Sequence, residues 1–190
     1  MSQQNSGLIR RRLGWLLALT LAILAVVVVG AGLLWVKSAQ GFSATAPPTA
    51  MEAMMADMAR RMAMPSQAAA MRNPLPTTPA NLTMASQHFA AHCALCHNNN
   101  GDGLTDLGRD LYPKPPDLRA PLTQDKSDGE LFYTIRNGIR LSGMPAWPDD
   151  ENDEIWMLVS LIRHLPQQTP AEVEAMKAYN PKSIFPEPIM

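Results

Sequence analysis

The stretch Cys93-Ala94-Leu95-Cys96-His97 decides how this chain folds, because it puts two thiols and an imidazole within about one helical turn. The sequence has two cysteines in all, and both lie in this stretch. Thiols at this spacing can add to the two vinyl groups of a haem, and the histidine that follows then faces the iron. The motif is therefore typical of covalent c-type haem attachment.

Other uses of a cysteine pair fit this sequence less well. A structural zinc site takes about four nitrogen or sulfur ligands, usually as two separated pairs, and the chain has no second cysteine pair. A thioredoxin-like C-x-x-C follows a strand, whereas Ala85–His92 is helical in composition. A plain disulfide leaves His97 without a role. Haem attachment is the interpretation that uses all three side chains.

Charge is unevenly distributed along the 190 residues, although the formal net charge is only −1. Residues 1–80 carry seven Lys or Arg and two acids, whereas residues 81–190 carry nine Lys or Arg and fifteen acids. The acidic part disfavours nucleic-acid binding. The excess of acids would steer this part of the chain towards basic partner surfaces. Ordinary solubility explains the same excess of acids equally well.

An uncharged and almost wholly apolar segment spans Leu13–Val36. At about 1.5 Å per residue it is about 36 Å long, which exceeds the hydrocarbon core of about 30 Å. Arg10, Arg11 and Arg12 precede it, and only Lys37 follows closely. The positive-inside rule then predicts a cytoplasmic N-terminus at residues 1–12 and a single-pass anchor at 13–36 in the inner (cytoplasmic) membrane. The rest of the chain is expected in the periplasm.

A cleaved signal peptide is the alternative to this anchor. Ala44-Thr45-Ala46 resembles an A-x-A cleavage site. However, the apolar core of a signal peptide has about 7–15 residues, and Leu13–Val36 is far longer. We therefore favour an uncleaved anchor, and both alternatives export the cysteine-containing region.

Residues 37–80 have the composition of a linker. Pro, Thr and Ala dominate residues 41–50 and 73–80, which predicts extended chain with polyproline II character. Residues 51–64 instead favour a helix, which Pro65 should end. If the whole linker were a flexible coil, its mean reach would be about 35–40 Å.

The helix predicted at 51–64 carries methionines at helical spacing, which form one stripe: Met51, Met54, Met55, Met58 and Met62. A methionine face adapts well to irregular surfaces, so the stripe fits packing on a partner or on the chain's own haem domain. It also fits the membrane surface. Thioethers are soft ligands that suit Cu(I), but no histidine or cysteine in this helix strengthens a copper site.

The compact domain is predicted at residues 81–165, with helices only, because no stretch alternates convincingly as a strand. Asn81 is expected to cap a first helix that runs to about Cys96, and the turn cluster Asn98–Gly103 ends it. The proline-rich Tyr112–Leu118 predicts an irregular loop.

Later helices have explicit start signals. The capping box Ser127-x-x-Glu130 predicts a helix over 131–137 that Gly138 closes. Acids at 149–154 favour the start of a last helix running to about Leu165. Its predicted apolar face is Ile155, Leu158, Val159 and Ile162.

The C-terminal extension, residues 166–190, is predicted to add one helix. Thr169-x-x-Glu172 forms a capping box with Pro170 at the first helical position. Asn180-Pro181 and Pro186–Pro188 predict irregular chain. No feature of the extension indicates a function.

Residues 81–165 resemble the class I cytochrome c family in the order and spacing of their motifs. After C-x-x-C-H come Gly101-Asp102-Gly103, a Pro-Pro-Asp-Leu loop at 115–118, and Ser142-Gly143-Met144-Pro145-Ala146-Trp147. The pattern is especially similar to the membrane-anchored bacterial members, such as the haem subunits of cbb3-type oxidases. The resemblance implies an all-α fold of three to five helices around one covalent haem c. A single transmembrane helix and a Met/Pro-rich linker precede that fold here.

The resemblance also implies the iron ligands. Cys93 and Cys96 hold the haem covalently, His97 is the proximal ligand, and Met144 is the sixth ligand. Gly143 permits a sharp turn before Met144, and Pro145 stiffens the exit. A thioether ligand raises the reduction potential relative to a nitrogen ligand, so a high-potential, low-spin haem is expected.

Three other histidines are rival ligands. His88 and His92 lie on the same predicted helix as the cysteines, and cannot easily reach the opposite haem face. His164 lies near the end of the last helix, where its charged form suits the helix dipole. Surface positions explain all three.

Residues around the ligands are assigned by the same resemblance. A ligating histidine usually donates its second N–H to a carbonyl or carboxylate, and in the family a proline carbonyl accepts it. Pro115 and Pro116 both match. Trp147 is expected to pack over the haem edge. Arg136 and Tyr133 are candidates for contacts with the propionates, with simple surface placement as the alternative, and Ala85 and Phe89 are expected between the first and last helices.

The implied function is one-electron transfer by a membrane-anchored, periplasm-facing mono-haem c-type cytochrome that is not itself an enzyme. One alternative is a fixed haem subunit of a respiratory or dehydrogenase complex, with the methionine stripe and the extension as interface. A weaker one is a gas sensor or enzyme with an open sixth position. The expected partners are redox proteins or membrane-complex subunits, and the lipid bilayer through residues 13–36. The electron donor and acceptor are not indicated.

Overall fold

A computed structural model describes residues 2–38 and 43–182, and these residues form helices, turns and loops without a strand. The all-helical prediction is confirmed for this part of the chain. Two compact units are present, residues 1–46 and residues 47–190. The irregular segment predicted at Pro186–Pro188 lies outside the described residues.

The first unit is dominated by α1 (Ser2–Ser38), which begins eleven residues before the predicted segment and ends two residues after it. Its part from Arg11 to Lys37 is long enough to cross a membrane, and the most apolar 18-residue window within it has a mean hydropathy of 2.8 and no buried residue. A buried core helix of a soluble protein is therefore excluded. Length and composition leave an anchor or a signal sequence.

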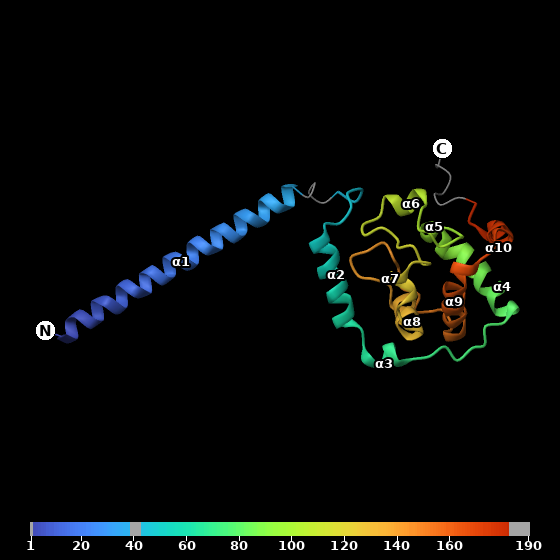
Figure 1. Ribbon diagram of the computed structural model, residues 1–190, viewed down its shortest axis with the longest axis horizontal. Coiled ribbons are helices and arrows are strands. Elements are labelled where there is room, and N and C mark those ends of the chain that lie inside the picture. Colours follow the sequence, from blue (N-terminus) through green and yellow to red (C-terminus); the bar gives the residue numbers. More distant parts are fainter. Residues whose placement is uncertain (1, 39–42, 183–190) are drawn as a thin grey trace. The chain divides into compact units, whose positions relative to one another are not determined.

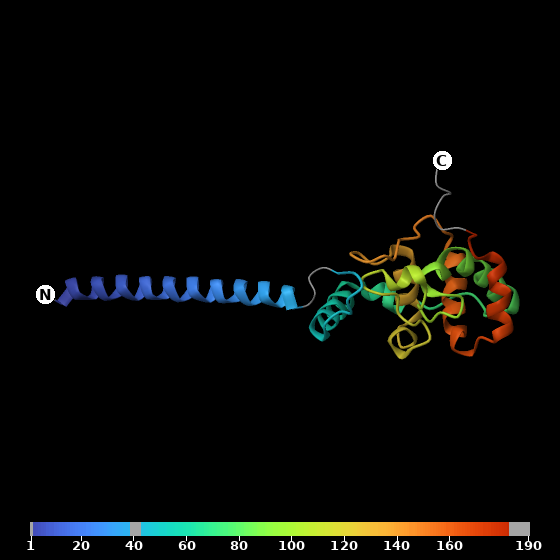
Figure 2. The same cartoon turned by 90° about the horizontal axis from the view of Figure 1, so that it is seen from above.

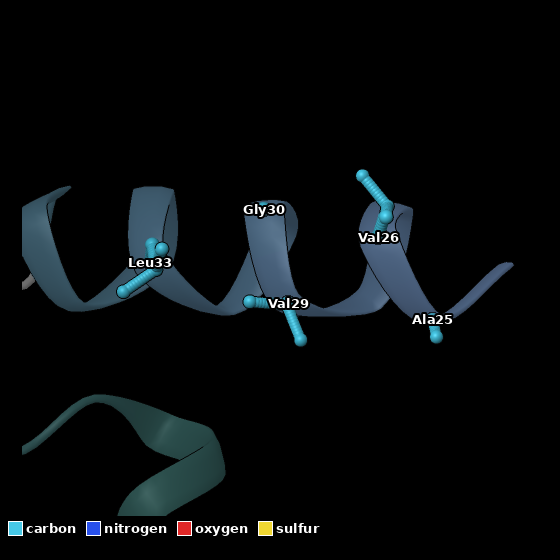
Figure 3. Close-up of a pocket in the computed structure, with 5 residues that line it drawn as sticks. All are labelled: Ala25, Val26, Val29, Gly30 and Leu33. Carbon is cyan, nitrogen blue, oxygen red and sulfur yellow. The ribbon is translucent and has the colours of Figure 1, made fainter. Parts of the chain in front are cut away.

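The polar groups inside α1 are satisfied within the helix. The hydroxyl of Thr20 donates to the carbonyl of Leu16, so this side chain adds no unpaired donor to an apolar environment. Figure 3 shows a shallow apolar surface along the helix, formed by small and branched residues: Ala25, Val26, Val29, Gly30 and Leu33. Such a surface suits hydrocarbon chains on all sides.

The predicted methionine-rich helix is α2 (Ala50–Ala63), which ends before Pro65 as expected. Its start is fixed by a capping box between Thr49 and Glu52, a signal that the sequence contains and our prediction did not use. No residue of α2 is buried. The five stripe methionines are 58–79% exposed, so packing of the stripe on the chain's own domain is wrong.

The second half of the linker packs on the domain. A short helix that was not predicted, α3 (Ser66–Ala70), lies against α8 (Asp128–Asn137), and Ser127 Oγ donates to the Ala69 carbonyl at 2.8 Å. Asn73 Nδ2 donates to the Trp156 carbonyl at 2.9 Å and to Ser160 Oγ at 2.8 Å. Extended chain at 73–78 is confirmed, but it is held in place by these bonds.

The helix that leads to the cysteines differs from the prediction at its start and in its middle. Thr78, not Asn81, is the N-cap of α4 (Pro79–His88): its side chain accepts from the Asn81 N–H, while Asn81 Nδ2 donates to the Pro76 carbonyl. The helix then widens into the π-helical turn η1 (Phe89–Cys93) before α5 (Ala94–His97). The prediction of Asn81 as the cap was wrong because Pro79 suits the first helical turn.

The later helices follow their predicted signals. The capping box of Ser127 and Glu130 opens α8, and Gly138, with φ of 64°, closes it. The last long helix, α9 (Asn152–His164), begins with a reciprocal cap between Glu151 and Glu154. Two short helices in the loops were not predicted: α6 (Asp106–Arg109) and α7 (Pro121–Gln124).

The core forms where α4 and η1 cross α9. Figures 1 and 2 show α4 (green) against α9 (orange), with α8 on the other side of α9. Ala90, Ile155 and Val159 are completely buried at 0% exposure. Phe89 and Ala85 belong to the same cluster, which confirms their predicted structural role, and the whole predicted apolar face of α9 is buried.

The C-terminal extension is part of this domain rather than a free tail. The predicted capping box of Thr169 and Glu172 opens α10 (Pro170–Met176). Met176 is buried in the core at 2% exposure. Gln87 Nε2 donates to the Tyr179 hydroxyl at 3.0 Å, which ties the extension to α4.

The contact between α3 and α8 can be tested with Gly129→Ala. A Cβ at Gly129 would lie 1.9 Å from the Ala68 carbonyl oxygen, so α3 must lift away. We expect a loss of about 1–3 kcal/mol in the free energy of unfolding and faster tryptic cleavage after Arg72. Gly14→Ala is the control, because nothing lies within 4 Å of its Cβ position. Unchanged cleavage after Arg72 in Gly129→Ala would contradict the packing.

Candidate functional site

Cys93 and Cys96 lie on consecutive turns at the junction of η1 and α5, and neither forms a disulfide. Burial raises the pKa of the Cys93 thiol to about 12, with the nearby Asp150 carboxylate adding to the effect. Burial also raises the pKa of the Cys96 thiol. Two unbridged, protonated thiols therefore stand one helical turn apart. π-helical turns are frequent at functional sites, and this one ends at the first cysteine.

His97 closes the same segment and is held by the loop that follows. Its carbonyl accepts from the Gly103 N–H at 3.0 Å. Gly103 has φ of 72°, and a Cβ there would lie 2.6 Å from the Pro115 carbonyl oxygen. Only glycine lets the two backbone segments come this close. This contact brings the proline loop next to the imidazole.

The imidazole of His97 is desolvated. Burial lowers the pKa of His97, and the backbone carbonyl of Pro116 partly offsets this by interacting with the ring. Nδ1 itself is buried and forms no hydrogen bond of normal length and angle. Of the two candidate prolines, Pro116 is the one whose carbonyl acts on the ring, while the Pro115 carbonyl lies against Gly103.

Met144 lies on a loop that folds back onto the end of α8. The Ile139 N–H donates to the Met144 carbonyl at 3.2 Å, and the Met144 N–H donates to Ser142 Oγ at 3.2 Å. Ser142 Oγ in turn donates to the Ile139 carbonyl at 2.7 Å. The Met144 side chain is half-buried and packs against the core. The loop therefore fixes the backbone on both sides of the thioether.

The sharp turn expected at Gly143 occurs elsewhere. Gly138 and Leu141 have positive φ, 64° and 59°, whereas Gly143 does not. Gly143 instead lies against a side chain, since a Cβ there would lie 2.8 Å from both terminal methyls of Leu111. The sequence contains no signal that distinguishes Leu141 as the left-handed residue.

Arg136 holds this loop to the start of α9. Its guanidinium donates from Nη1 to the carbonyls of Pro148, at 2.6 Å, and Asp150, at 2.8 Å, and from Nη2 to Asn152 Oδ1. The Arg136 carbonyl also accepts from the Trp147 N–H at 3.1 Å. The sequence makes Arg136 a candidate for contacts with the haem propionates. In the structure, its N–H groups donate to two backbone carbonyls and to Asn152 Oδ1.

Trp147 packs against two histidines rather than standing alone. Its ring lies edge-on to His92 at 5.4 Å and to His88 at 6.1 Å between centroids. The third rival ligand, His164, pairs with Glu172 at 2.9 Å. Tyr133 is half-buried on α8, where its carbonyl accepts from Asn137. His88 and His92 thus contact the Trp147 ring, and His164 pairs with Glu172.

The donor set at this site fits a covalently bound haem. Two unbridged thiols lie one helical turn apart, and a buried imidazole follows with Nδ1 facing a carbonyl. A separate loop, held by hydrogen bonds that involve Ile139, Ser142 and Arg136, carries the Met144 thioether. An all-helical domain with this combination defines a c-type cytochrome domain.

Comparison with known families agrees. Residues 80–162 match the family described as cytochrome C oxidase, cbb3-type, subunit III. This segment is therefore a c-type cytochrome domain of that type, a family whose members carry covalent haem and transfer electrons. No curated protein matches the chain.

The role of Arg136 can be tested with Arg136→Met. Loss of hydrogen bonds to two carbonyls should loosen the loop and lower the free energy of unfolding by about 1–3 kcal/mol. In the haem-loaded protein, the charge-transfer band of a thioether–iron bond should disappear at a lower temperature. Arg109→Met is the control, because Arg109 pairs only with the 95%-exposed Asp106 side chain. Equal behaviour of the two variants would contradict this role.

Proposed function

We propose that this chain is a membrane-anchored, periplasm-facing mono-haem c-type cytochrome that transfers single electrons. In this proposal Cys93 and Cys96 form the thioether links, and His97 and Met144 are the axial iron ligands. The observation that carries it is the C-x-x-C-H turn with its desolvated histidine, together with a hydrogen-bonded loop whose Met144 packs against the same core as Cys93. The haem, when bound, takes up and releases one electron at its iron.

The residues of the chain set the properties of that site. Pro116 orients the His97 ring through its carbonyl and so keeps the second ring nitrogen directed at the iron. Leu118, Leu131 and Ile135 are buried in the core against which Cys93 and Met144 pack, and a dry apolar surround limits the reorganisation that accompanies electron transfer. A thioether as sixth ligand favours the reduced state relative to a nitrogen ligand.

The anchor is part of the proposal. Most side chains of α1 between Arg11 and Lys37 are exposed and apolar, which suits lipid contact. Three arginines precede the apolar segment, so the N-terminus stays in the cytoplasm. The domain is then on the periplasmic side of the inner membrane.

A fixed subunit of a larger respiratory complex is the second candidate. The exposed methionine stripe of α2 favours it, because a contiguous apolar face on a helix usually marks an interaction surface. The matched family is named for an oxidase subunit. Purification in mild detergent distinguishes the two: a large partner that co-purifies supports the fixed subunit, and a free monomer supports the tethered carrier.

Met144→Ala tests the sixth ligand in the haem-loaded protein. We expect the reduced variant to bind CO readily, because the iron loses its thioether, and the reduction potential to fall by on the order of 0.1 V. Met54→Ala is the control, because Met54 is 64% exposed on α2. A spectrum and potential like those of the wild type in Met144→Ala would exclude Met144, and ready CO binding by the wild type would favour a sensor or enzyme.

The mass of the mature chain tests the anchor. We expect the protein in membranes to retain the α1 segment and to resist extraction at alkaline pH. Intact mass and N-terminal peptides measure this directly. A mature chain that begins after Ala46 would instead show that α1 is a signal sequence.

A further inference from the structure

A cluster of three metal-binding side chains lies beside the cysteines and is not used by the proposed electron-transfer site. His88 ends α4, Asp150 lies in the loop before α9, and Glu154 lies in the first turn of α9. One ligand atom from each side chain lies within 4.8 Å of the other two. The end of α4 and the start of α9, which are far apart in the sequence, therefore converge on one point.

The closest pair in this cluster is close without being hydrogen-bonded. His88 Nε2 and Asp150 Oδ2 are 3.4 Å apart. Both atoms are buried, and neither has a hydrogen-bond partner. A buried polar atom without a partner destabilises a fold by about 1–3 kcal/mol, so two such atoms side by side need an explanation. An ion bound between them provides one.

The separation suits a tetrahedral metal. Zinc binds imidazole nitrogen and carboxylate oxygen at about 2.0–2.2 Å, and two ligands on a tetrahedron are then about 3.3–3.5 Å apart. The observed 3.4 Å between Nε2 and Oδ2 falls in this range. The three ligand atoms lie within 4.8 Å of one another, so Glu154 has to approach by up to about 1.4 Å to reach a tetrahedral separation, which rotation about its side-chain torsions allows. One of its oxygens accepts from the Glu151 N–H at 3.3 Å.

The surroundings strengthen such a site. A pocket of about 230 Å³ opens onto His88 and Glu154, and its other walls are Met84, Ala85 and Met157. The ring of His92 lies 4.9 Å from that of His88. Apolar walls lower the local dielectric and so increase the attraction between a cation and two carboxylates.

We propose that His88, Asp150 and Glu154 bind one divalent transition-metal ion of the zinc class. An imidazole with two carboxylates carries two negative charges, which suits a divalent ion, and the nitrogen donor favours Zn²⁺ over Mg²⁺ or Ca²⁺. Three protein ligands leave a fourth position for water. The site is separate from the haem ligands His97 and Met144 and does not depend on their assignment.

The ion would be electrostatically coupled to the haem attachment. The Asp150 carboxylate acts on the Cys93 sulfur, so its charge is felt where the haem is attached. A divalent cation bound to Asp150 and Glu154 cancels the two negative charges of these carboxylates. Removing an electron from a nearby haem then becomes harder, and its reduction potential should rise.

The experiment uses the full-length, haem-loaded protein in detergent, titrated with Zn²⁺ alone and followed by calorimetry. We expect one Zn²⁺ per chain, a higher unfolding temperature with Zn²⁺, and an upward shift of the reduction potential. His88→Gln and Asp150→Asn should each weaken binding by about tenfold or more and abolish the potential shift. The visible spectrum of each variant checks that its haem site is intact.

His164→Gln is the matched control. His164 and Glu172 are also a histidine–carboxylate pair, 2.9 Å apart, but they are hydrogen-bonded and belong to no three-residue cluster. The control should bind Zn²⁺ like the wild type. The proposal is overturned if the wild type binds no Zn²⁺ at micromolar concentrations. It is also overturned if both His88→Gln and Asp150→Asn leave affinity and potential shift unchanged.

Discussion

The crossing of the cysteine-bearing segment over α9 is the contact on which the rest of the domain depends. Ala85, Phe89 and Ala90 present two small side chains and one large ring to α9, and all three are almost fully buried. Small residues on one helix let the other approach closely, and the ring fills the remaining space. The crossing fixes the direction of α5, and with it the position of both thiols and His97.

The opposite side of the site depends on polar contacts instead. The loop that carries Met144 is held by Arg136 and Ser142 and shaped by the left-handed residues Gly138 and Leu141, while its Met144 and Trp147 side chains pack against the core. One wall of the site is thus a packed helix, and the other is a hydrogen-bonded loop. A loop held by directional bonds can place a ligand accurately without a large core behind it.

Much of the fold could be predicted from local signals. Local signals include the capping boxes at Ser127 and Thr169 and the apolar periodicity of α9. Each acts within a few residues of its own position, so it can be recognised directly in the sequence. Docking of α3 and Asn73 could not be predicted, because α3 packs against Gly129 and Asn73 bonds to Trp156 and Ser160, all more than fifty residues away. The π-helical turn before Cys93 is likewise set by packing rather than by propensity.

For the site, the motif at Cys93–His97 could be found from its spacing, and the resemblance to class I cytochromes c indicated the loop at Met144. The clamp by Arg136 was missed because its partners are backbone carbonyls, which have no signature in a sequence. The meeting of His88 with Asp150 was missed for a similar reason: it requires knowing how the end of α4 meets the start of α9. Sequence patterns report neighbours along the chain, and these contacts join segments far apart.

Docking of the linker changes how far the haem can travel. Residues 66–78 are held on the domain by α3 and Asn73, so they add nothing to the reach of a tether. If residues 37–65 acted as a flexible coil, their mean reach would be about 27–32 Å, compared with about 35–40 Å for the whole linker. Because the accessible volume scales with the cube of the reach, the proposed tethered haem would meet a partner in the same membrane at about twice the local concentration. Docking of the linker exchanges range for encounter frequency.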